Sequence, residues 1–180
     1  MALYEPVNPL FPLRKVFWDI EKLKAEAQTV KGNALEMPIY DGDKRMGIVT
    51  ALPATPAYEP PELINLRDSF MEQYPIDWGE VTPVYMWINT VYPWHVDNKP
   101  NAQWSKHKGA GRLPHCAINI ILEGGAAPVE FKGWMPQLYE AALLNTSVPH
   151  RVTPLEERVL GRLSFKDKTF EEVVEGIKSG

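Results

Sequence analysis

Cysteine is nearly absent from this sequence, because Cys116 is the only one among 180 residues. A single thiol excludes a disulfide bond within the chain, and it excludes a zinc cluster built from several thiolates. A metal site in this protein must therefore use histidine, aspartate or glutamate side chains. Four histidines are present.

Long hydrophobic runs are missing as well. No stretch approaches the roughly 18 to 20 apolar residues that cross a bilayer, and the start, MALYEPVNPL, lacks the pattern of a secretory signal. We therefore expect a soluble, cytoplasmic protein without a membrane partner. Excess positive charge is also lacking: the net charge of −4 gives no long-range attraction for phosphate backbones, so nucleic acid is a disfavoured partner. The sequence does not indicate an oligomeric state.

Apolar residues are plentiful, at 44% of the chain, and aromatic residues make up 11%. This is enough for one substantial core but not for two ordinary domains, so we expect a single domain over residues 1–180. Apolar side chains recur at helical spacing in residues 16–28, 60–74 and 168–178. We expect a helical scaffold over residues 14–75, in which frequent prolines and glycines between 32 and 61 leave room only for short strands such as GIVTAL.

After residue 80 the pattern changes to short segments rich in β-branched and aromatic residues, divided by turn residues. Glu123, Gly124 and Gly125 form a hairpin or tight-turn signal. We predict a mainly β, α+β fold: a barrel or jelly-roll core over residues 80–166, supported by the N-terminal helices and a C-terminal helix. The strands are expected at residues 82–91, 114–123, 128–131, 140–144, 148–153 and 158–165.

The segment YPWHVDNKP places His95 and Asp97 one residue apart directly after a predicted strand. Side chains at alternate strand positions point to the same side, so these two could hold one metal ion. An HxD pair alone is weak evidence, since such residues are often merely solvated or hydrogen-bonded. A third ligand from a later strand would strengthen it, and His150 in NTSVPHRVTP is the candidate, although it too could be a hydrogen-bonded histidine at a strand start.

The last predicted strand, RVLGRLSF, has an apolar face that suits the helices and an opposite face with two arginines and a serine. A buried arginine is costly unless it meets an anion, which favours an anionic ligand inside the core. The strand HCAINIIL is divided in the same way, with the polar side chains of His115 and Asn119 on one face. Extending the alternation back from His95 adds Trp87 and Asn89 to the pocket, unless Pro93 breaks the register.

The motifs HVD (95–97), PHRV (149–152) and RLS (162–164) resemble those of the non-haem iron(II), 2-oxoglutarate-dependent dioxygenases. The resemblance covers residues 82–165. Within this superfamily, RLPHCAINIIL and LLNTSVPHRV look most similar to the aspartyl/asparaginyl hydroxylase-like branch. The resemblance implies a double-stranded β-helix fold of the jelly-roll or cupin type.

The same resemblance implies roles for individual residues. His95, Asp97 and His150 would be the catalytic iron(II) ligands, a facial triad that leaves coordination positions open for 2-oxoglutarate and O2. Arg162 and Ser164 would bind the distal carboxylate of 2-oxoglutarate, so that Arg162→Ala would raise the 2-oxoglutarate requirement with iron binding little changed. Three further residues are open for this pocket: Arg158, which could exchange roles with Arg162, and His115 and Asn119, which could equally be satisfied core residues.

The implied reaction is hydroxylation of an amino-acid or peptide side chain (Asp, Asn or Pro) or of a small metabolite, with release of succinate and CO2. Two other interpretations stay open: a jelly-roll binding module without catalysis, and a cupin-type isomerase whose histidines act as acid and base. The long loop at 98–112 follows the first ligands, as active-site lids often do, although the sequence favours a solvated flexible loop. Its candidate substrate contacts are Lys99, Trp104, Lys106, Lys108 and Arg112.

Overall fold

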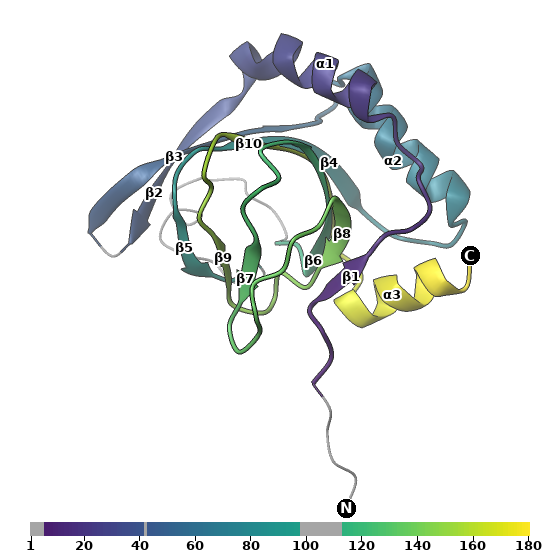
Figure 1. The fold of residues 1–180 in the computed structure, drawn as a ribbon. Coiled ribbons are helices and arrows are strands. Elements are labelled where there is room, and N and C mark those ends of the chain that lie inside the picture. Colours follow the sequence, from purple (N-terminus) through teal and green to yellow (C-terminus); the bar gives the residue numbers. More distant parts are fainter. Residues whose placement is uncertain (1–5, 42, 98–112) are drawn as a thin grey trace, which may run out of the picture.

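Two antiparallel sheets face each other across the interior of the molecule, as the computed structural model shows for residues 6–41, 43–97 and 113–180 (Figure 1). The large sheet has the strand order β1-β8-β6-β10-β4-β3-β2, and the small sheet has the order β5-β9-β7. This confirms the predicted mainly β fold. The strands are β1 (Leu10–Pro12), β2 (Leu35–Asp41), β3 (Lys44–Pro53), β4 (Val81–Ile88), β5 (Tyr92–His95), β6 (Cys116–Glu123), β7 (Val129–Phe131), β8 (Ala141–Leu144), β9 (His150–Val152) and β10 (Arg158–Phe165).

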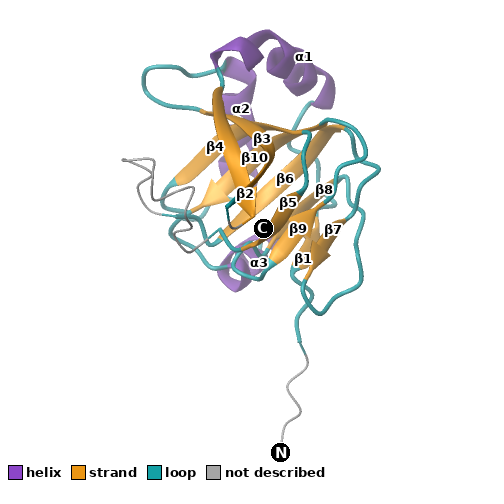
Figure 2. Ribbon diagram, turned by 90° about the vertical axis from the view of Figure 1, so that its left-hand side faces the viewer, coloured by secondary structure: helices purple, strands orange, loops and turns teal. Residues whose placement is uncertain are grey.

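Three helices pack on the outer face of the large sheet: α1 (Ile20–Val30), α2 (Pro61–Gln73) and α3 (Phe170–Lys178) (Figures 1 and 2). Their buried side chains form one cluster with Ile118 of β6 and with Leu163 and Phe165 of β10, so the helices cover the face of these strands that the sequence predicted. Helix α1 begins later than expected because Asp19 accepts a hydrogen bond from the backbone N–H of Lys22 and so caps the helix. Among the described residues no helix is long and apolar enough to span a membrane.

The side chain of the N-cap residue of helix α2 makes no hydrogen bond to the first turn of that helix. A side chain from another helix caps it instead. Glu26 of α1 accepts hydrogen bonds from the backbone N–H groups of Glu62 and Leu63, at 2.9 Å each, and from the Tyr85 hydroxyl at 2.8 Å. This one carboxylate therefore joins α1, α2 and β4. It also lies where the partial positive charge of a helix N-terminus favours an anion.

We expect Glu26→Ala to lower the free energy of unfolding by about 2 kcal/mol, because the variant leaves two N–H groups and a hydroxyl without their charged acceptor. Urea denaturation measures this change. Glu21→Ala is the control, since Glu21 is an exposed glutamate of the same helix, and it should change stability by no more than about 0.5 kcal/mol. Equal effects of the two substitutions would contradict this role of Glu26.

The region between α1 and α2 contains a longer hairpin than the short strands expected from its prolines and glycines. Strand β3 has ten residues, and it pairs with β2 on one side and with β4 on the other. Ile39 and Val49 are buried together with Ile88 and Leu160. The hairpin therefore extends the inner face of the large sheet, and contacts distant in sequence stabilise it (Figure 2).

The chain changes sheets at two places: one where the sequence interpretation extended a strand, and one that it gave as a hairpin or a tight turn. Strand β4 ends at Ile88 in the large sheet and β5 begins at Tyr92 in the small one, so the alternation does not continue from His95 back to Trp87. Trp87 instead packs with the core cluster on the helix side, which corrects its assignment to the pocket. The turn at Gly124 leads from β6 to β7, which lie in different sheets and form no hairpin. Gly124 has φ of +72°, and a Cβ there would overlap the Glu157 carbonyl.

Candidate metal centre

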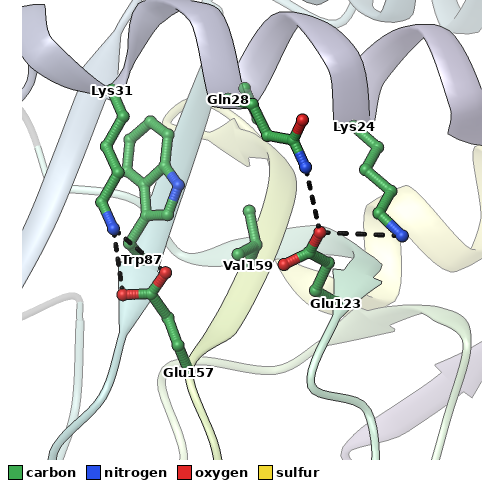
Figure 3. A pocket seen from close by; sticks show the side chains of 8 residues that line it. Lys24, Gln28, Lys31, Trp87, Glu123, Glu157 and Val159 are labelled. Carbon is green, nitrogen blue, oxygen red and sulfur yellow. Dashed lines mark hydrogen bonds and ion pairs between the residues drawn. The ribbon is translucent and has the colours of Figure 1, made fainter.

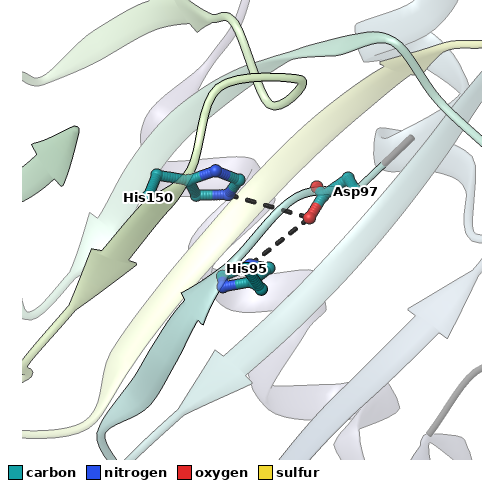
Figure 4. Close-up of side chains that lie close together, drawn as sticks. All are labelled: His95, Asp97 and His150. Carbon is teal, nitrogen blue, oxygen red and sulfur yellow. Dashed lines mark ion pairs between the residues drawn. The ribbon is translucent and has the colours of Figure 1, made fainter. Parts of the chain in front are cut away.

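The side chains of His95, Asp97 and His150 meet between the two sheets (Figure 4). His95 ends β5 and His150 begins β9, and the two residues are direct partners in the antiparallel pairing of these strands. Asp97 lies beyond the end of β5, where its backbone N–H donates to the Thr146 carbonyl at 2.8 Å. Asp97 is therefore positioned by a turn that is anchored on a neighbouring loop. The strand alternation, from which its position was predicted, does not extend to it.

Both imidazole rings are held in the same way. Nδ1 of His95 lies 2.7 Å from the Pro93 carbonyl, and Nδ1 of His150 lies 2.8 Å from the Val148 carbonyl. A carbonyl can only accept, so each Nδ1 carries a proton, and the lone pair of each ring in its neutral form is then at Nε2. The two Nε2 atoms lie 3.3 Å and 3.7 Å from Oδ1 of Asp97.

The charges at this site favour the ligand forms of these groups. Burial lowers the pKa of His150 to about 4, against the opposite effect of Asp97, so His150 is neutral at pH 7. Burial alone would raise the pKa of Asp97. The Arg162 guanidinium and the two imidazoles outweigh that effect and hold the pKa of this carboxyl far below its usual range. The centre therefore presents one carboxylate and at least one neutral imidazole.

This geometry fits a divalent metal ion. Three acceptor atoms, all within 4.8 Å of one another, converge while the protons of both rings point elsewhere, and a shared cation removes the repulsion between their lone pairs. Ligands at about 2.1 Å from one ion and at right angles lie about 3 Å apart. The two Nε2–Oδ1 distances are somewhat longer, at 3.3 Å and 3.7 Å, so the ligand atoms would have to draw together around an ion. Two histidines and one carboxylate on one side of an ion form the set that suits iron(II) and leaves positions open.

Arg162 lies directly beside this group. Its Nη2 donates to Oδ2 of Asp97 at 2.6 Å, and its Nε donates to the Ser164 hydroxyl at 3.2 Å. From the sequence we predicted that Arg162 and Ser164 lie together in the core, and they do. We also predicted that the guanidinium binds the anion of a cosubstrate. Its anionic partner in the structure is Asp97.

Arg158 occupies a second polar position on β10, and only 1% of the surface of this residue is exposed. Nη1 donates to the Ala127 carbonyl and Nη2 to the Tyr139 hydroxyl, each at 2.7 Å, and the Asn119 amide donates to the same hydroxyl at 3.1 Å. Within the described part of the chain, Arg158 Nε and Asn119 Oδ1 have no hydrogen-bond partner, and no carboxylate pairs with Arg158. This buried cluster therefore has one uncompensated positive charge.

The sequence missed two residues of the site. Tyr139 links Arg158 to Asn119 across separations of 19 and 20 residues, and no motif surrounds it. Thr146 supplies the carbonyl that positions Asp97. His115 does not join the metal group of the described residues; its carbonyl accepts from the Ser147 hydroxyl, and its ring is within electrostatic range of Glu172 in α3. The loop at 98–112, with its basic residues and Trp104, lies outside the described residues.

A cleft of about 200 Å³ lies elsewhere, between α1 and the outer face of the large sheet (Figure 3). Trp87 and Val159 line it, and its charges are already paired. Lys31 binds Glu157 at 3.0 Å, and Lys24 and Gln28 both contact Glu123. Trp87 and Val159 point away from the interior that holds the metal group, so this cleft is separate from the candidate centre.

The fold is similar to that of several solved structures. A Pseudomonas putida prolyl-4-hydroxylase matches with a TM-score of 0.53 and 15% identity, over 83% of this chain and 86% of that one. HygX from Streptomyces hygroscopicus, solved with nickel, 2-oxoglutarate and hygromycin B, matches with a TM-score of 0.48 and 12% identity, over 89% and 83%. An oxidoreductase of the 2OG-Fe(II) oxygenase family from Burkholderia pseudomallei matches with a TM-score of 0.46 and 14% identity, over 83% and 81%.

No protein-family model and no curated protein sequence matches the chain. The first of these structural similarities shows that the chain has the fold of that prolyl-4-hydroxylase, and its two facing antiparallel sheets agree with the predicted double-stranded β-helix. At this level of identity it shows the fold alone, so the function has to be argued from the side chains.

Proposed function

We propose that this protein is an iron(II)- and 2-oxoglutarate-dependent oxygenase. The observation that supports this most directly is the convergence of three acceptor atoms, from His95, Asp97 and His150, in the interior of a double-stranded β-helix. The buried Arg158 cluster supports it independently: none of the described residues gives this charge an anionic partner, and an acidic ligand would supply one.

In this proposal the three side chains hold iron(II) on one face. When bound, iron would supply the oxidising chemistry by which a substrate C–H group, O2 and 2-oxoglutarate give the hydroxylated substrate, succinate and CO2. The Pro93 and Val148 carbonyls orient the two imidazoles, and Thr146 orients Asp97, so the ligands need little rearrangement when the ion enters. The side chains of His95, Asp97 and His150 are 16%, 15% and 8% exposed, so little water reaches the reacting groups.

We propose Arg158, and not Arg162, as the anchor for the distal carboxylate of 2-oxoglutarate. The Tyr139 oxygen accepts from both Arg158 and Asn119, so its own proton is available for a ligand. A carboxylate at this position would accept from the Tyr139 hydroxyl and from Arg158 Nε, and it would neutralise the buried guanidinium. Arg162 is already paired with Asp97. This is the exchange of roles that the sequence left open.

The primary substrate we propose is an Asp, Asn or Pro side chain in an amino acid or a peptide, with a small metabolite as the alternative. The aspartyl/asparaginyl hydroxylase-like motifs in RLPHCAINIIL and LLNTSVPHRV favour the first two. The fold similarity to a prolyl-4-hydroxylase favours the third. Substrate selection in this fold depends on the loops at the mouth of the site.

Anaerobic titration of the purified protein with iron(II) and then 2-oxoglutarate tests this function. We expect a weak visible metal-to-ligand charge-transfer band, which forms only when both are bound to one site, and release of succinate once O2 and a substrate are admitted. Absence of the band would refute the proposal. Binding without succinate release for any substrate would favour a binding module, and activity that survives chelation and anoxia would favour an isomerase.

A further inference from the structure

The two carboxylate oxygens of Asp97 face different partners. Oδ1 faces the metal position, at 3.3 Å from Nε2 of His95 and 3.7 Å from Nε2 of His150. Oδ2 accepts a hydrogen bond from Arg162 Nη2 at 2.6 Å, the shortest ion pair in the described part of the chain. One oxygen is thus directed to the ion and the other is occupied by a cation from β10.

Contacts on both sides fix this arrangement. The Arg162 side chain is 12% exposed, its Nε donates to the Ser164 hydroxyl at 3.2 Å, and its Nη1 lies 3.7 Å from the sulfur of Met86. The backbone N–H of Asp97 is bound to the Thr146 carbonyl. These contacts hold the guanidinium and the backbone of Asp97 in place, so the division between the two oxygens follows from the positions of β10 and the turn.

We propose that Arg162, oriented by Ser164, is a positioning residue that keeps Asp97 a one-oxygen metal ligand. This inference rests on the proposed function. Without the guanidinium, the carboxylate could turn and bind the ion through both oxygens, and it would then fill the one coordination position that stays open for O2 once 2-oxoglutarate has bound. The guanidinium also keeps the carboxylate fixed before the ion arrives, so its loss should weaken metal binding.

Two arginines on the same face of β10 thus have separate tasks. Arg158 has no anionic partner among the residues that the structure describes, whereas the charge of Arg162 is already paired with the metal ligand Asp97. Loss of Arg158 should therefore act on 2-oxoglutarate binding, and loss of Arg162 on the metal. From the sequence alone, Arg162→Ala was predicted to raise the 2-oxoglutarate requirement with iron binding little changed. The structure leads to the opposite expectation.

The experiment compares metal binding by the wild type and by Arg162→Met, which retains a long apolar side chain without the charge. We expect the Mn(II) dissociation constant to rise about tenfold, within the range found when an outer partner of a metal ligand is removed. The visible spectrum of the Co(II)-loaded protein should change as the second oxygen of Asp97 binds. The affinity for 2-oxoglutarate at saturating Mn(II) should stay within about threefold of the wild type.

Two further variants narrow the interpretation. Arg162→Lys should recover part of the Mn(II) affinity, because an ammonium group also pairs with Oδ2, though without the rigid fork of the guanidinium. Arg151→Met is the matched control, because Arg151 on β9 pairs with Glu130 at 2.7 Å in the same kind of ion pair, and its loss should leave the Mn(II) affinity and the Co(II) spectrum unchanged.

An unchanged Co(II) spectrum in Arg162→Met, or Mn(II) binding that is unchanged or tighter, overturns the inference. A tenfold loss of 2-oxoglutarate affinity with normal metal binding would return Arg162 to the role of cosubstrate anchor. If Arg162→Met does not fold, Ser164→Ala retains the charge but frees the guanidinium, and it should give a smaller change in the same direction. A wild type that binds no metal would refute the proposed function itself, which separates the two failures.

Discussion

Asp97→Ala is expected to weaken Mn(II) and iron(II) binding by more than about a hundredfold and to abolish 2-oxoglutarate turnover. Asp97 provides the only carboxylate of the group formed by the described residues, and its charge offsets that of the ion. Removing a ligand should exceed the tenfold to hundredfold loss typical of an outer partner. Titration of the apoprotein with Mn(II), followed by the electron paramagnetic resonance of the free ion, measures the loss.

Glu130→Ala is the matched control for this prediction. Glu130 also pairs with an arginine, Arg151, but its neighbours Val129 and Phe131 are the buried residues of β7, so it lies on the opposite face of the small sheet. Metal binding by the control should equal that of the wild type. Asp97→Ala leaves Arg162 without its anion, so Asp97→Asn, which retains an acceptor for Arg162, checks that a loss of binding does not reflect unfolding. Normal metal affinity in both Asp97 variants would refute the metal site.

Arg158→Met is expected to raise the dissociation constant of 2-oxoglutarate by about a hundredfold, with Mn(II) binding nearly unchanged. A hydrogen-bonded contact between a guanidinium and a carboxylate contributes roughly 1.5 to 3 kcal/mol, and the upper end applies where both groups are buried. The residue is 1% exposed, and its guanidinium has no anionic partner among the residues described here. Calorimetric titration of the Mn(II)-loaded protein with 2-oxoglutarate measures the effect.

Two other substitutions test whether this loss belongs to the Arg158 cluster. Tyr139→Phe removes only the hydroxyl that Arg158 and Asn119 share, so it should weaken 2-oxoglutarate binding by a smaller factor, about tenfold. Arg151→Met, which removes an arginine from the outer face of the small sheet, should have no effect. If Arg158→Met binds 2-oxoglutarate as tightly as the wild type, the anchor lies elsewhere.

Much of the site could be predicted because its parts are local. An HxD pair, a downstream histidine and an arginine with a serine two residues later are visible in the sequence, and strand alternation correctly placed Arg158, Arg162 and Ser164 on the face opposite the helices. The strand at Arg158–Phe165 was predicted with the bounds that the structure has. These inferences succeeded because strand periodicity depends only on neighbouring residues.

The parts that failed depend on contacts between distant segments. Pairing with β4 lengthens β3 beyond the short strand that its sequence suggests. Tyr139 and Glu26 have no local signal, and each gains its role from partners in other elements. Trp87 was assigned to the wrong face because the chain changes sheets between Ile88 and Tyr92, and an alternation cannot be extended across such a crossing.

The amino-acid pattern alone was sufficient for the mainly β fold, the three candidate metal ligands and the presence of two inward-facing arginines. It could not assign a role to each of those arginines, because both lie on the same face of one strand. They differ only in the residues of other segments that contact them. Folding brings Asp97 to Arg162 across 65 residues and brings Tyr139 and Asn119 to Arg158. Packing between the sheets decides which side chain lies beside a buried charge. The amino-acid pattern does not specify which residues of distant segments come into contact.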